Sequence, residues 1–274
     1  MIELPEAAVL AKQFNETVTG RKIKKVVAAQ SPHKFTWYYG DPGKYNSLLA
    51  GKTVGNAVNH GGMVEIKAGS ATLLFGDGVS MQYYAKSGKL PDKHQLWVEF
   101  EDSSSIVAKV QMYGGLWVFP GDSFDNKYYL MAKEKPSPLQ VAFDKTYFNT
   151  LFSEDTGKLS LKAFLATEQR IPGLGNGVLQ DILFNAKMHP KRKVNTLTEK
   201  DRKELFSSLK STLAKMTAEG GRDTEVDLYG KHGGYRTILS KNTVGKPCPV
   251  CEKTIRKEAY LGGSIYYCPR CQKP

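Results

Sequence analysis

The spacing of apolar residues predicts a helix at the start of the chain and a series of short strands after it. Leu4, Ala8, Ala11 and Phe14 recur at about the 3.6-residue helical period, and Gly20 follows where such a helix can end. From residue 22 to about residue 129, short apolar runs alternate with glycine-containing turns, which is typical of antiparallel hairpins in a sandwich or barrel. The predicted strands are Ile23–Val27, Met63–Ile66, Thr72–Phe75, Leu96–Phe100, Ser105–Val110 and Leu116–Phe119.

The period becomes helical after Lys133–Pro138, a charged segment with two prolines that we interpret as a linker. Four helices are then predicted, over residues 139–152, 159–167, 178–187 and 198–218. Residues 229–245 are rich in glycine and basic side chains and predict a loop. The chain therefore divides into an N-terminal β-sandwich domain over 1–132, a helical domain over 133–228 and a C-terminal segment over 229–274.

The four cysteines lie near the end of the sequence in two Cys-x-x-Cys pairs, Cys248 with Cys251 and Cys268 with Cys271. Sixteen residues separate the pairs, a spacing typical of a zinc ribbon in which four thiolates hold one structural ion. The intervening segment is long enough for a hairpin with its turn at Leu261–Ser264. Two disulfides in a secreted protein are the alternative. No secretory signal precedes the first residues, so we expect zinc and a cytoplasmic location.

Basic residues outnumber acidic ones in the 274-residue chain, 39 Lys and Arg against 27 Asp and Glu, for a net charge of +12. A surplus of this size predicts a polyanionic partner such as nucleic acid, although a basic surface without a specific ligand would give the same balance. The sequence has neither a concentrated basic amphipathic helix nor an apolar run of membrane-spanning length, so no membrane partner is expected.

A glycine-rich turn, Ile171–Gly177, precedes one of the predicted helices. Glycines before a helix allow its first N–H groups to approach a phosphate, which the helix dipole also favours. Asn176 adds an amide donor at the same point. The turn alone is not specific, because many such turns only reverse the chain.

Motifs at both ends of the chain and in its middle occur in the order found in one family. The N-terminal run MIELPE is similar to Met-Pro-Glu-Leu-Pro-Glu, and Gly173–Asn176 is similar to a helix–two-turn–helix signature with Lys162 placed ahead of it. The four cysteines match a zinc finger in spacing and position. In these features the chain resembles the formamidopyrimidine-DNA glycosylase and endonuclease VIII family over its whole length.

The resemblance implies an α+β multidomain fold: an N-terminal β-sandwich with a first helix, a helical helix–two-turn–helix domain and a C-terminal zinc-ribbon hairpin. It also implies a monomer that binds damaged double-stranded DNA between the first two domains, near the nucleoid. In that family a damaged base is flipped into the cleft, and the N-terminal amine attacks C1′ of the sugar to leave a Schiff base. A β-elimination then nicks the strand.

The catalytic residues of the family are only partly retained. Glu3 matches its catalytic glutamate, although an acid at a helix start, favoured by the dipole, would explain both Glu3 and Glu6. Ile2 stands where the family has the proline that supplies the amine. The initiator methionine is poorly removed before a bulky residue, so the free amine is expected on Met1, one residue out of place. Removal of Met1 would instead leave a primary amine on Ile2.

Other departures concern contacts with DNA. Gly61 stands where the family has a lysine. Residues 76–78 stand where it has a methionine that fills the place of the flipped base. Gly263 stands where the zinc finger of the family has an arginine. Met112 and Tyr113 replace an arginine and a phenylalanine; Tyr113 can still wedge into the base stack, whereas Met112 would fit a core equally well. The DNA-binding residues that we expect are Asn176, Lys162, Gly175, Tyr113, Met112, His94 and Arg270.

These features together predict a DNA glycosylase of base-excision repair in which AP-lyase activity is weak, altered or absent. Glu3 would then activate water for hydrolysis of the glycosidic bond. The alternative is a protein that binds damaged DNA and has lost the chemistry. A mobile loop that recognises the lesion is expected around Lys231, His232, Tyr235 and Arg236, with a solvated loop of no such role as the simpler explanation.

Overall fold

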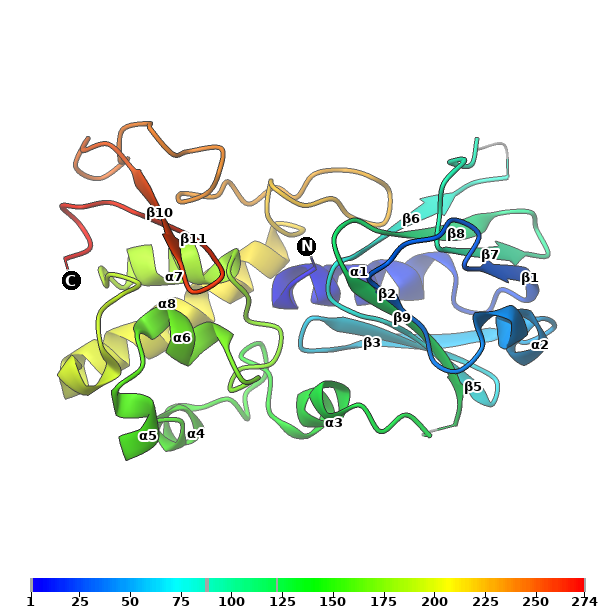
Figure 1. Ribbon diagram of the computed structural model, residues 1–274, viewed down its shortest axis with the longest axis horizontal. Helices are drawn as coiled ribbons and strands as arrows, with labels where there is room; N and C mark the ends of the chain where they lie inside the picture. Colours follow the sequence, from blue (N-terminus) through cyan, green and yellow to red (C-terminus); the bar gives the residue numbers. More distant parts are fainter. Residues whose placement is uncertain (1, 87–88, 122, 274) are drawn as a thin grey trace.

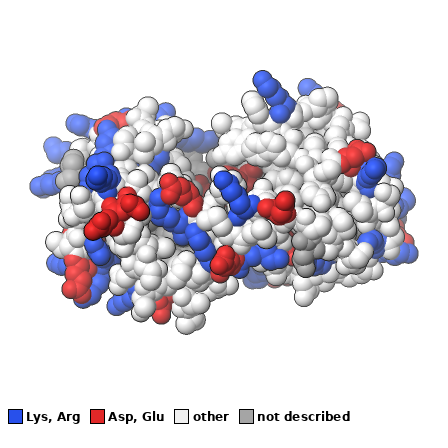
Figure 2. All heavy atoms as spheres, turned by 60° about the horizontal axis from the view of Figure 1, so that its bottom comes forward, with Lys and Arg blue, Asp and Glu red and all other residues white. Residues whose placement is uncertain are grey.

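The computed structural model describes residues 2–86, 89–121 and 123–273, which form two lobes joined by a narrower waist (Figure 1). The first lobe contains two β-sheets, and the second contains a group of helices with a β-hairpin lying across them. On the face drawn in Figure 2, lysines and arginines are intermixed with acidic side chains over both lobes. The positive charge is therefore not gathered into a single patch on this face.

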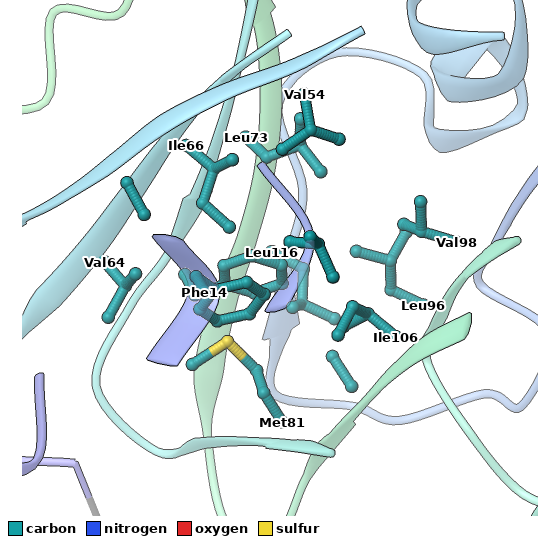
Figure 3. Close-up of a cluster of buried hydrophobic side chains, with 14 of the residues drawn as sticks. Phe14, Val54, Val64, Ile66, Leu73, Met81, Leu96, Val98, Ile106 and Leu116 are labelled. Atoms are coloured by element: carbon teal, nitrogen blue, oxygen red, sulfur yellow. The ribbon is translucent and has the colours of Figure 1, made fainter. Parts of the chain in front are cut away.

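The first lobe is a β-sandwich, as predicted, with the first helix packed into it. Its two sheets have the strand orders β1-β7-β8-β6 and β2-β9-β5-β4-β3. Phe14 of α1 (Leu4–Thr17) lies in the core among apolar side chains from both sheets (Figure 3). The strands are β1 Ile23–Ala28, β2 Thr36–Trp37, β3 Val54–His60, β4 Met63–Ala68, β5 Ala71–Phe75, β6 Val79–Tyr84, β7 Leu96–Phe100, β8 Ser105–Val110 and β9 Gly114–Pro120.

Three of these strands, β2, β3 and β6, were not predicted from the sequence. The clearest case is β3, because glycine and asparagine within it disfavour a strand. The side chain of Asn15 on α1 compensates: its Oδ1 accepts the Ala57 N–H at 2.7 Å, and its Nδ2 donates to the Ala57 carbonyl at 2.8 Å. A side chain from a neighbouring helix therefore pairs with this edge strand, which local sequence does not reveal.

The second lobe contains five helices in the described ranges besides the short 3-10 turn Val194–Thr196. They are α4 Lys145–Thr150, α5 Glu154–Gly157, α6 Leu161–Ala166, α7 Val178–Asn185 and α8 Glu199–Ala218. The helix α3, Lys127–Glu134, packs against the β-sandwich instead, where its Tyr129 clusters with Leu74 and Phe119 (Figure 1). In the first lobe a 3-10 turn, Pro42–Lys44, leads into the short helix α2, Tyr45–Leu49. The helix predicted over 139–152 is wrong in its first half, because Asp144 caps a new helix there by accepting the Tyr147 N–H at 2.8 Å. The predicted start of α8 at Thr198 is confirmed as its N-cap.

The C-terminal hairpin consists of β10 (Arg256–Tyr260) and β11 (Gly263–Tyr267), which pair in antiparallel fashion. The turn falls at the predicted place, with Leu261 at φ 48° and Gly262 at φ 70°. Two successive positive φ angles are the signature of a type I′ turn, whose twist matches that of paired strands. The hairpin lies against α7 (Figure 1), and its tip reaches Lys162 of α6, whose Nζ donates to the Tyr260 carbonyl.

Residues 222–240, which we call the crossing loop, follow α8 and reach the first lobe before returning to the hairpin (Figure 1). Leu228 is buried in the β-sandwich core, and its carbonyl accepts the Tyr83 N–H at 2.7 Å. On the return, the Asp181 carboxylate accepts the N–H groups of Ile238 and Leu239 at 2.9 and 2.8 Å. The loop is therefore held at both lobes.

This anchoring changes the interpretation of the basic, glycine-rich segment. Tyr235, expected in a mobile lesion-recognition loop, is buried in the core of the helical lobe. His232 faces the space between the lobes, whereas Lys231 and Arg236 are exposed. Apolar anchors spaced several residues apart hold the loop in place, and their periodicity matches neither a helix nor a strand. Within the described ranges, no helix has the length and apolar character needed to cross a membrane.

Candidate functional site

A cavity of about 550 Å³ opens where the two lobes, the crossing loop and the hairpin meet. Each part of the chain contributes side chains to its walls. The lining includes Ile2, Glu3, Glu6, Gly78 and Met112 from the first lobe, and Asn176, Gly177, Gln180, Arg222, His232 and Tyr266 from the rest of the chain. The cavity is therefore the place where a bound molecule would meet both lobes at once.

Glu3 lies in this wall with its carboxylate at the first turn of α7. One oxygen accepts the Gly177 N–H and the other accepts the Val178 N–H, each at 2.8 Å. The helix dipole favours a negative charge at this end. Burial nevertheless raises the pKa of Glu3 above its ordinary value and outweighs the lowering effects of Arg222 and of the two amides. The carboxylate is thus firmly positioned and has a higher proton affinity than an exposed glutamate.

Glu6 forms a buried ion pair with Arg222. The Arg222 Nε lies 2.9 Å from one carboxylate oxygen of Glu6, and Nη2 lies 2.7 Å from the other. Although burial alone would raise it, this guanidinium holds the pKa of Glu6 below its ordinary value. Glu6 also accepts the backbone N–H of Glu3 at 3.1 Å. The expected helix-start role of Glu6 is therefore present, together with an ion pair that the sequence did not indicate.

The glycines of the predicted phosphate-binding turn make room for these charged groups. A Cβ atom on Gly177 would lie 1.7 Å from Arg222 Nη1, and one on Gly175 would lie 2.6 Å from Glu3 Cδ. Any side chain at either position would displace the carboxylate or the guanidinium. The first amides of α7 already bind Glu3, so the interpretation of this helix start as a phosphate site is corrected. Its anion is a carboxylate from the same chain.

Asn176 and Lys162 both hold the tip of the hairpin. Asn176 Nδ2 donates to the Ser264 carbonyl at 3.0 Å, and Lys162 Nζ donates to the Tyr260 carbonyl. Gln180 joins them, because its Nε2 donates to the Asn176 carbonyl at 2.9 Å and its Oε1 accepts the Tyr266 N–H at 3.0 Å. The structure thus brings two predicted DNA-binding residues together with the hairpin tip at the edge of the cavity.

The four cysteine sulfur atoms lie within 4.8 Å of one another. Cys251 Sγ is 3.3 Å from Cys268 Sγ, and Cys248 Sγ is 3.8 Å from Cys271 Sγ, far beyond the roughly 2.05 Å of a disulfide bond. Four thiolates at these separations fit around one ion with Zn–S bonds of about 2.3 Å. The cysteines therefore form a structural zinc site, as predicted, and the disulfide alternative is excluded.

Met112 and Tyr113 form a projecting turn between β8 and β9 at the rim of the cavity. Met112 is 68% exposed, which excludes the interpretation of this residue as part of a core. Asp77 lies beside them in the turn between β5 and β6. Partial burial of its carboxyl raises its pKa and outweighs the lowering effects of the Gly78 amide and the Tyr113 hydroxyl.

The turn between β3 and β4, where the family has a lysine, packs backbone to backbone against the glycine-rich segment. A Cβ on Gly173 would lie 2.2 Å from Gly62 N, and a Cβ on Gly61 would lie 2.8 Å from the Pro172 carbonyl carbon. A side chain on Gly61 would therefore clash with the glycine-rich segment, and Gly61 is not among the described residues that line the cavity.

The remaining predicted residues are placed less centrally. Neither His94 nor Arg270 is among the described residues that line the cavity. His94 is buried, with its Nδ1 3.1 Å from the Pro91 carbonyl. Arg270 is exposed, between Cys268 and Cys271. Ile2 lines the cavity wall, but most of its side chain is buried in the β-sandwich core. Met1 lies outside the described residues.

Sequence reasoning missed Arg222, Gln180 and Asp77. A single arginine among many basic residues gives no signal, although its position directly after the Gly220-Gly221 helix stop places it in a turn. Asp77 had a weak signal, because it lies between two glycines where an apolar residue was expected from the family. Gln180 gave none, since a glutamine in a helix is usually exposed.

Comparisons with known proteins agree with this geometry. Residues 135–227 match the formamidopyrimidine-DNA glycosylase H2TH domain, and residues 245–274 match a zinc finger found in formamidopyrimidine-DNA glycosylases and isoleucyl-tRNA synthetases. The chain is 28% identical to a formamidopyrimidine-DNA glycosylase of Listeria monocytogenes over 100% of both chains. It is 29% identical to that of Mycoplasmopsis pulmonis over 100% of this chain and 98% of the relative.

Solved structures show the same fold. The MutM (Fpg) protein of Thermus thermophilus superposes with a TM-score of 0.82 at 22% identity, covering 98% of each chain. The Fpg protein of Lactococcus lactis, solved in complex with DNA containing an abasic site, superposes with a TM-score of 0.83 at 22% identity, covering 99% of this chain and 100% of the other. With its two matched domains, full-length relatives and four-cysteine hairpin, the chain belongs to the formamidopyrimidine-DNA glycosylase and endonuclease VIII family.

Proposed function

We propose that this DNA glycosylase of base-excision repair releases a damaged base from duplex DNA by hydrolysis, with an AP-lyase step that is weak or absent. The observation that carries the proposal is the position of Ile2, whose side chain is only 7% exposed and packs in the β-sandwich core. In the family the residue at this position supplies the nucleophilic amine. Here it serves as an apolar anchor.

The backbone after Ile2 is fixed as well. The Leu4 N–H donates to the Gly173 carbonyl at 2.8 Å, and the Glu3 carboxylate is bound at the start of α7. When Met1 is retained, the nitrogen of Ile2 is a peptide nitrogen, which is not a nucleophile because its lone pair is delocalised. An amine on Met1 would be one residue further from Glu3 along the chain, and the anchored residues cannot shift to compensate.

Glu3 is the base that we assign to the hydrolytic reaction. Its two amide contacts occupy only part of the acceptor capacity of a carboxylate, and burial raises its pKa, which makes it a stronger base than an exposed glutamate. A water molecule would give its proton to Glu3 while its oxygen bonds to C1′ of the flipped nucleotide. The electron pair of the glycosidic bond leaves with the base, which takes a proton from solvent.

Asp77 is a second carboxylate near the cavity, next to Gly78, which lines it, and is the alternative acceptor for the proton of a water molecule. Matched variants, Glu3→Gln and Asp77→Asn, separate the two roles because each keeps the shape of the side chain and removes its charge. We expect Glu3→Gln to reduce base release by a factor of about 100 or more, the usual size of a general-base effect. Asp77→Asn should retain most of it. The reverse order would move the catalytic role to Asp77.

The test uses the full chain with duplexes that carry an oxidised base, an alkylated base or an abasic site, each with and without borohydride. Base release without a trapped covalent adduct is the expected result. A trapped adduct at a rate comparable to base release would show that the amine chemistry survives and would overturn the hydrolytic proposal. Tight binding with neither base release nor trapping would leave only the non-catalytic alternative.

DNA binding is proposed to use both lobes and the hairpin. Asn176 and Lys162 fix the hairpin tip and keep unused donors at the edge of the cavity, and the projecting Met112 and Tyr113 approach the bases from the first lobe. With a net charge of +12, affinity should fall steeply with salt, because contacts to phosphate release counterions. The protein would act on chromosomal DNA. We therefore expect it in the cytoplasm, associated with the nucleoid.

A further inference from the structure

The wall of the cavity has an excess of negative charge, although the chain as a whole has a net charge of +12. Among the described residues that line the cavity, with His232 counted as neutral, carboxylates outnumber permanent cations: Glu3, Glu6 and Glu225 against Arg222 and Lys241. Asp77, next to Gly78 of the lining, adds a further carboxylate. A base that enters the cavity therefore meets a local charge opposite in sign to that of the molecule.

The two cations offset little of this charge for a ligand. The guanidinium of Arg222 is buried and committed to carboxylates of the chain itself, with two hydrogen bonds to Glu6 and Nη1 3.6 Å from Glu3. Lys241 is exposed, so water and salt screen its charge. The excess of negative charge therefore remains available to a bound molecule.

The carboxylates also act on one another. Partial burial raises the pKa of Asp77, and the negative charge of Glu225 raises it further. Burial raises the pKa of Glu3 as well, and the charge of Glu6 adds to that shift. A carboxylate raises the pKa of its neighbour because it favours a positive charge, in this case a proton, at that place. A cationic ligand would experience the same attraction.

The chemistry of base release points to the same class of ligand. A purine alkylated on a ring nitrogen such as N7 is a cation, whereas its ring-opened counterpart is neutral. When the oxygen of water bonds to C1′ of such a nucleotide and gives its proton to Glu3, the electron pair of the glycosidic bond neutralises the base. The base then leaves as a neutral molecule without a covalent intermediate. This suits a chain in which Ile2 is a buried apolar anchor.

We propose that the cavity selects cationic damaged bases, that is, purines alkylated on a ring nitrogen. The assignment rests on the proposed function, in which the base is released by hydrolysis. Walls of one charge sign concentrate ligands of the opposite sign. As the bond breaks, positive charge passes from the base to the sugar, so it remains close to the same carboxylates. We assign the selectivity to Glu225, because Glu3 is the proposed base and Glu6 is held by Arg222.

The first experiment compares two duplexes that differ in the charge of one base. One contains N7-methylguanine and the other its neutral isostere 7-methyl-7-deazaguanine, each on a 2′-fluorinated sugar that resists base release. The wild-type protein should bind the cationic duplex about tenfold more tightly, because charges in a partly enclosed site attract more strongly than the ~1 kcal/mol found in bulk water. Equal affinity for the two duplexes would overturn the proposal.

Variants identify the protein charge responsible, because the charge on the base also changes its pairing in free duplex. Glu225→Gln should lower the ratio of the two affinities by about fivefold, the effect of losing roughly 1 kcal/mol of attraction. Glu101→Gln is the matched control: Glu101 is exposed, pairs with Lys22 at 2.8 Å and is not among the described residues that line the cavity. An equal change of the ratio in both variants would contradict the assignment to Glu225.

Base release separates this inference from the proposed function. Single-turnover release of N7-methylguanine, corrected for spontaneous loss, should be faster than release of its ring-opened formamidopyrimidine form, and Glu225→Gln should reduce the difference. Faster release of the ring-opened base, without a covalent adduct trapped by borohydride, would overturn the charge selectivity and leave hydrolysis intact. A trapped adduct would contradict hydrolysis alone, because the ratio of affinities is measured on sugars that do not react.

Discussion

Arg222 and Glu6 form a two-point ion pair, at 2.9 and 2.7 Å, that joins the segment after α8 to the first helix of the chain. The same guanidinium has Nη1 3.6 Å from a carboxylate oxygen of Glu3. One buried arginine therefore balances two buried carboxylates, and the charge pattern at the cavity depends on a contact between residues 216 positions apart.

We predict that Arg222→Ala destabilises the protein by about 3–5 kcal/mol, because it leaves two buried carboxylates without their cation. Urea unfolding followed by circular dichroism measures the effect. Arg222→Met combined with Glu6→Gln should be less destabilised than Arg222→Ala, since it also removes one of the charges. A loss in Arg222→Ala below about 1 kcal/mol, the range of surface pairs, would contradict the prediction.

Gly177→Ala should lower both stability and base release, because the added Cβ would lie 1.7 Å from Arg222 Nη1 and 2.9 Å from a Glu3 oxygen. Gly157→Ala is the matched control: its Cβ would meet only Asn195 Cβ, at 3.5 Å, an ordinary contact. Thermal unfolding and single-turnover base release on both variants test the point. Equal behaviour of the two variants would mean that the space beside Arg222 is not needed.

The carboxylate of Glu65 makes stability depend on acidic pH. Burial would raise its pKa, but hydrogen bonds from His60, Tyr129 and Lys67 lower it from 4.5 to about 2. A carboxyl with a depressed folded-state pKa contributes stability that is present above pH 4.5 and is lost as pH falls towards 2. The shift corresponds to at most about 3 kcal/mol, reduced by solvent screening.

Urea unfolding at several pH values between 2 and 7 should therefore show a steeper loss of stability in wild type than in Glu65→Gln. Their difference should be smallest at the acidic end of the range, where protonation of the carboxyl begins in the folded chain as well. If the unfolding free energies of the two proteins changed with pH in parallel, the hydrogen bonds at Glu65 would not be the cause of the pH dependence of stability.

Loss of zinc should release the hairpin and weaken DNA binding. In Cys248→Ala, one thiolate is missing, and the remaining three cannot complete the tetrahedral site. We expect zinc content to fall and affinity for lesion-containing duplex to decrease, with α7 and the β-sandwich retained in the circular dichroism spectrum. Chelator treatment of wild type should reproduce the result. Full affinity without metal would mean that the hairpin tip does not contact DNA.

Asn176→Ala should weaken DNA binding at every salt concentration. Gln180→Ala is its control, because Gln180 Nε2 also donates to the Ser264 carbonyl, at 3.2 Å, but lies one turn deeper in α7. Equal losses in the two variants would show that Asn176 acts only by holding the hairpin. A larger loss in Asn176→Ala, measured by titration with labelled duplex, would assign it a contact of its own.

Much of the fold could be predicted because it is encoded locally. Short apolar runs between turns identified six of the nine strands described in the β-sandwich, and the cysteine spacing predicted the zinc site and its hairpin turn. The strand β3 was missed because Asn15, more than forty residues away, provides its pairing partner. The helix predicted from residue 139 failed because a capping aspartate starts a new helix within the apolar periodicity.

The sequence by itself determined the parts of this protein: a sandwich, a helical lobe, a thiolate metal site and a glutamate at position 3. Local periodicity and motif spacing are sufficient for these features. Only the tertiary structure decided how the parts act together. The glycine turn receives Glu3 in place of a phosphate, Arg222 balances the buried acids, and Trp37 lies against Tyr113. Each of these relationships depends on steric fit and charge compensation between distant segments, which no local pattern records.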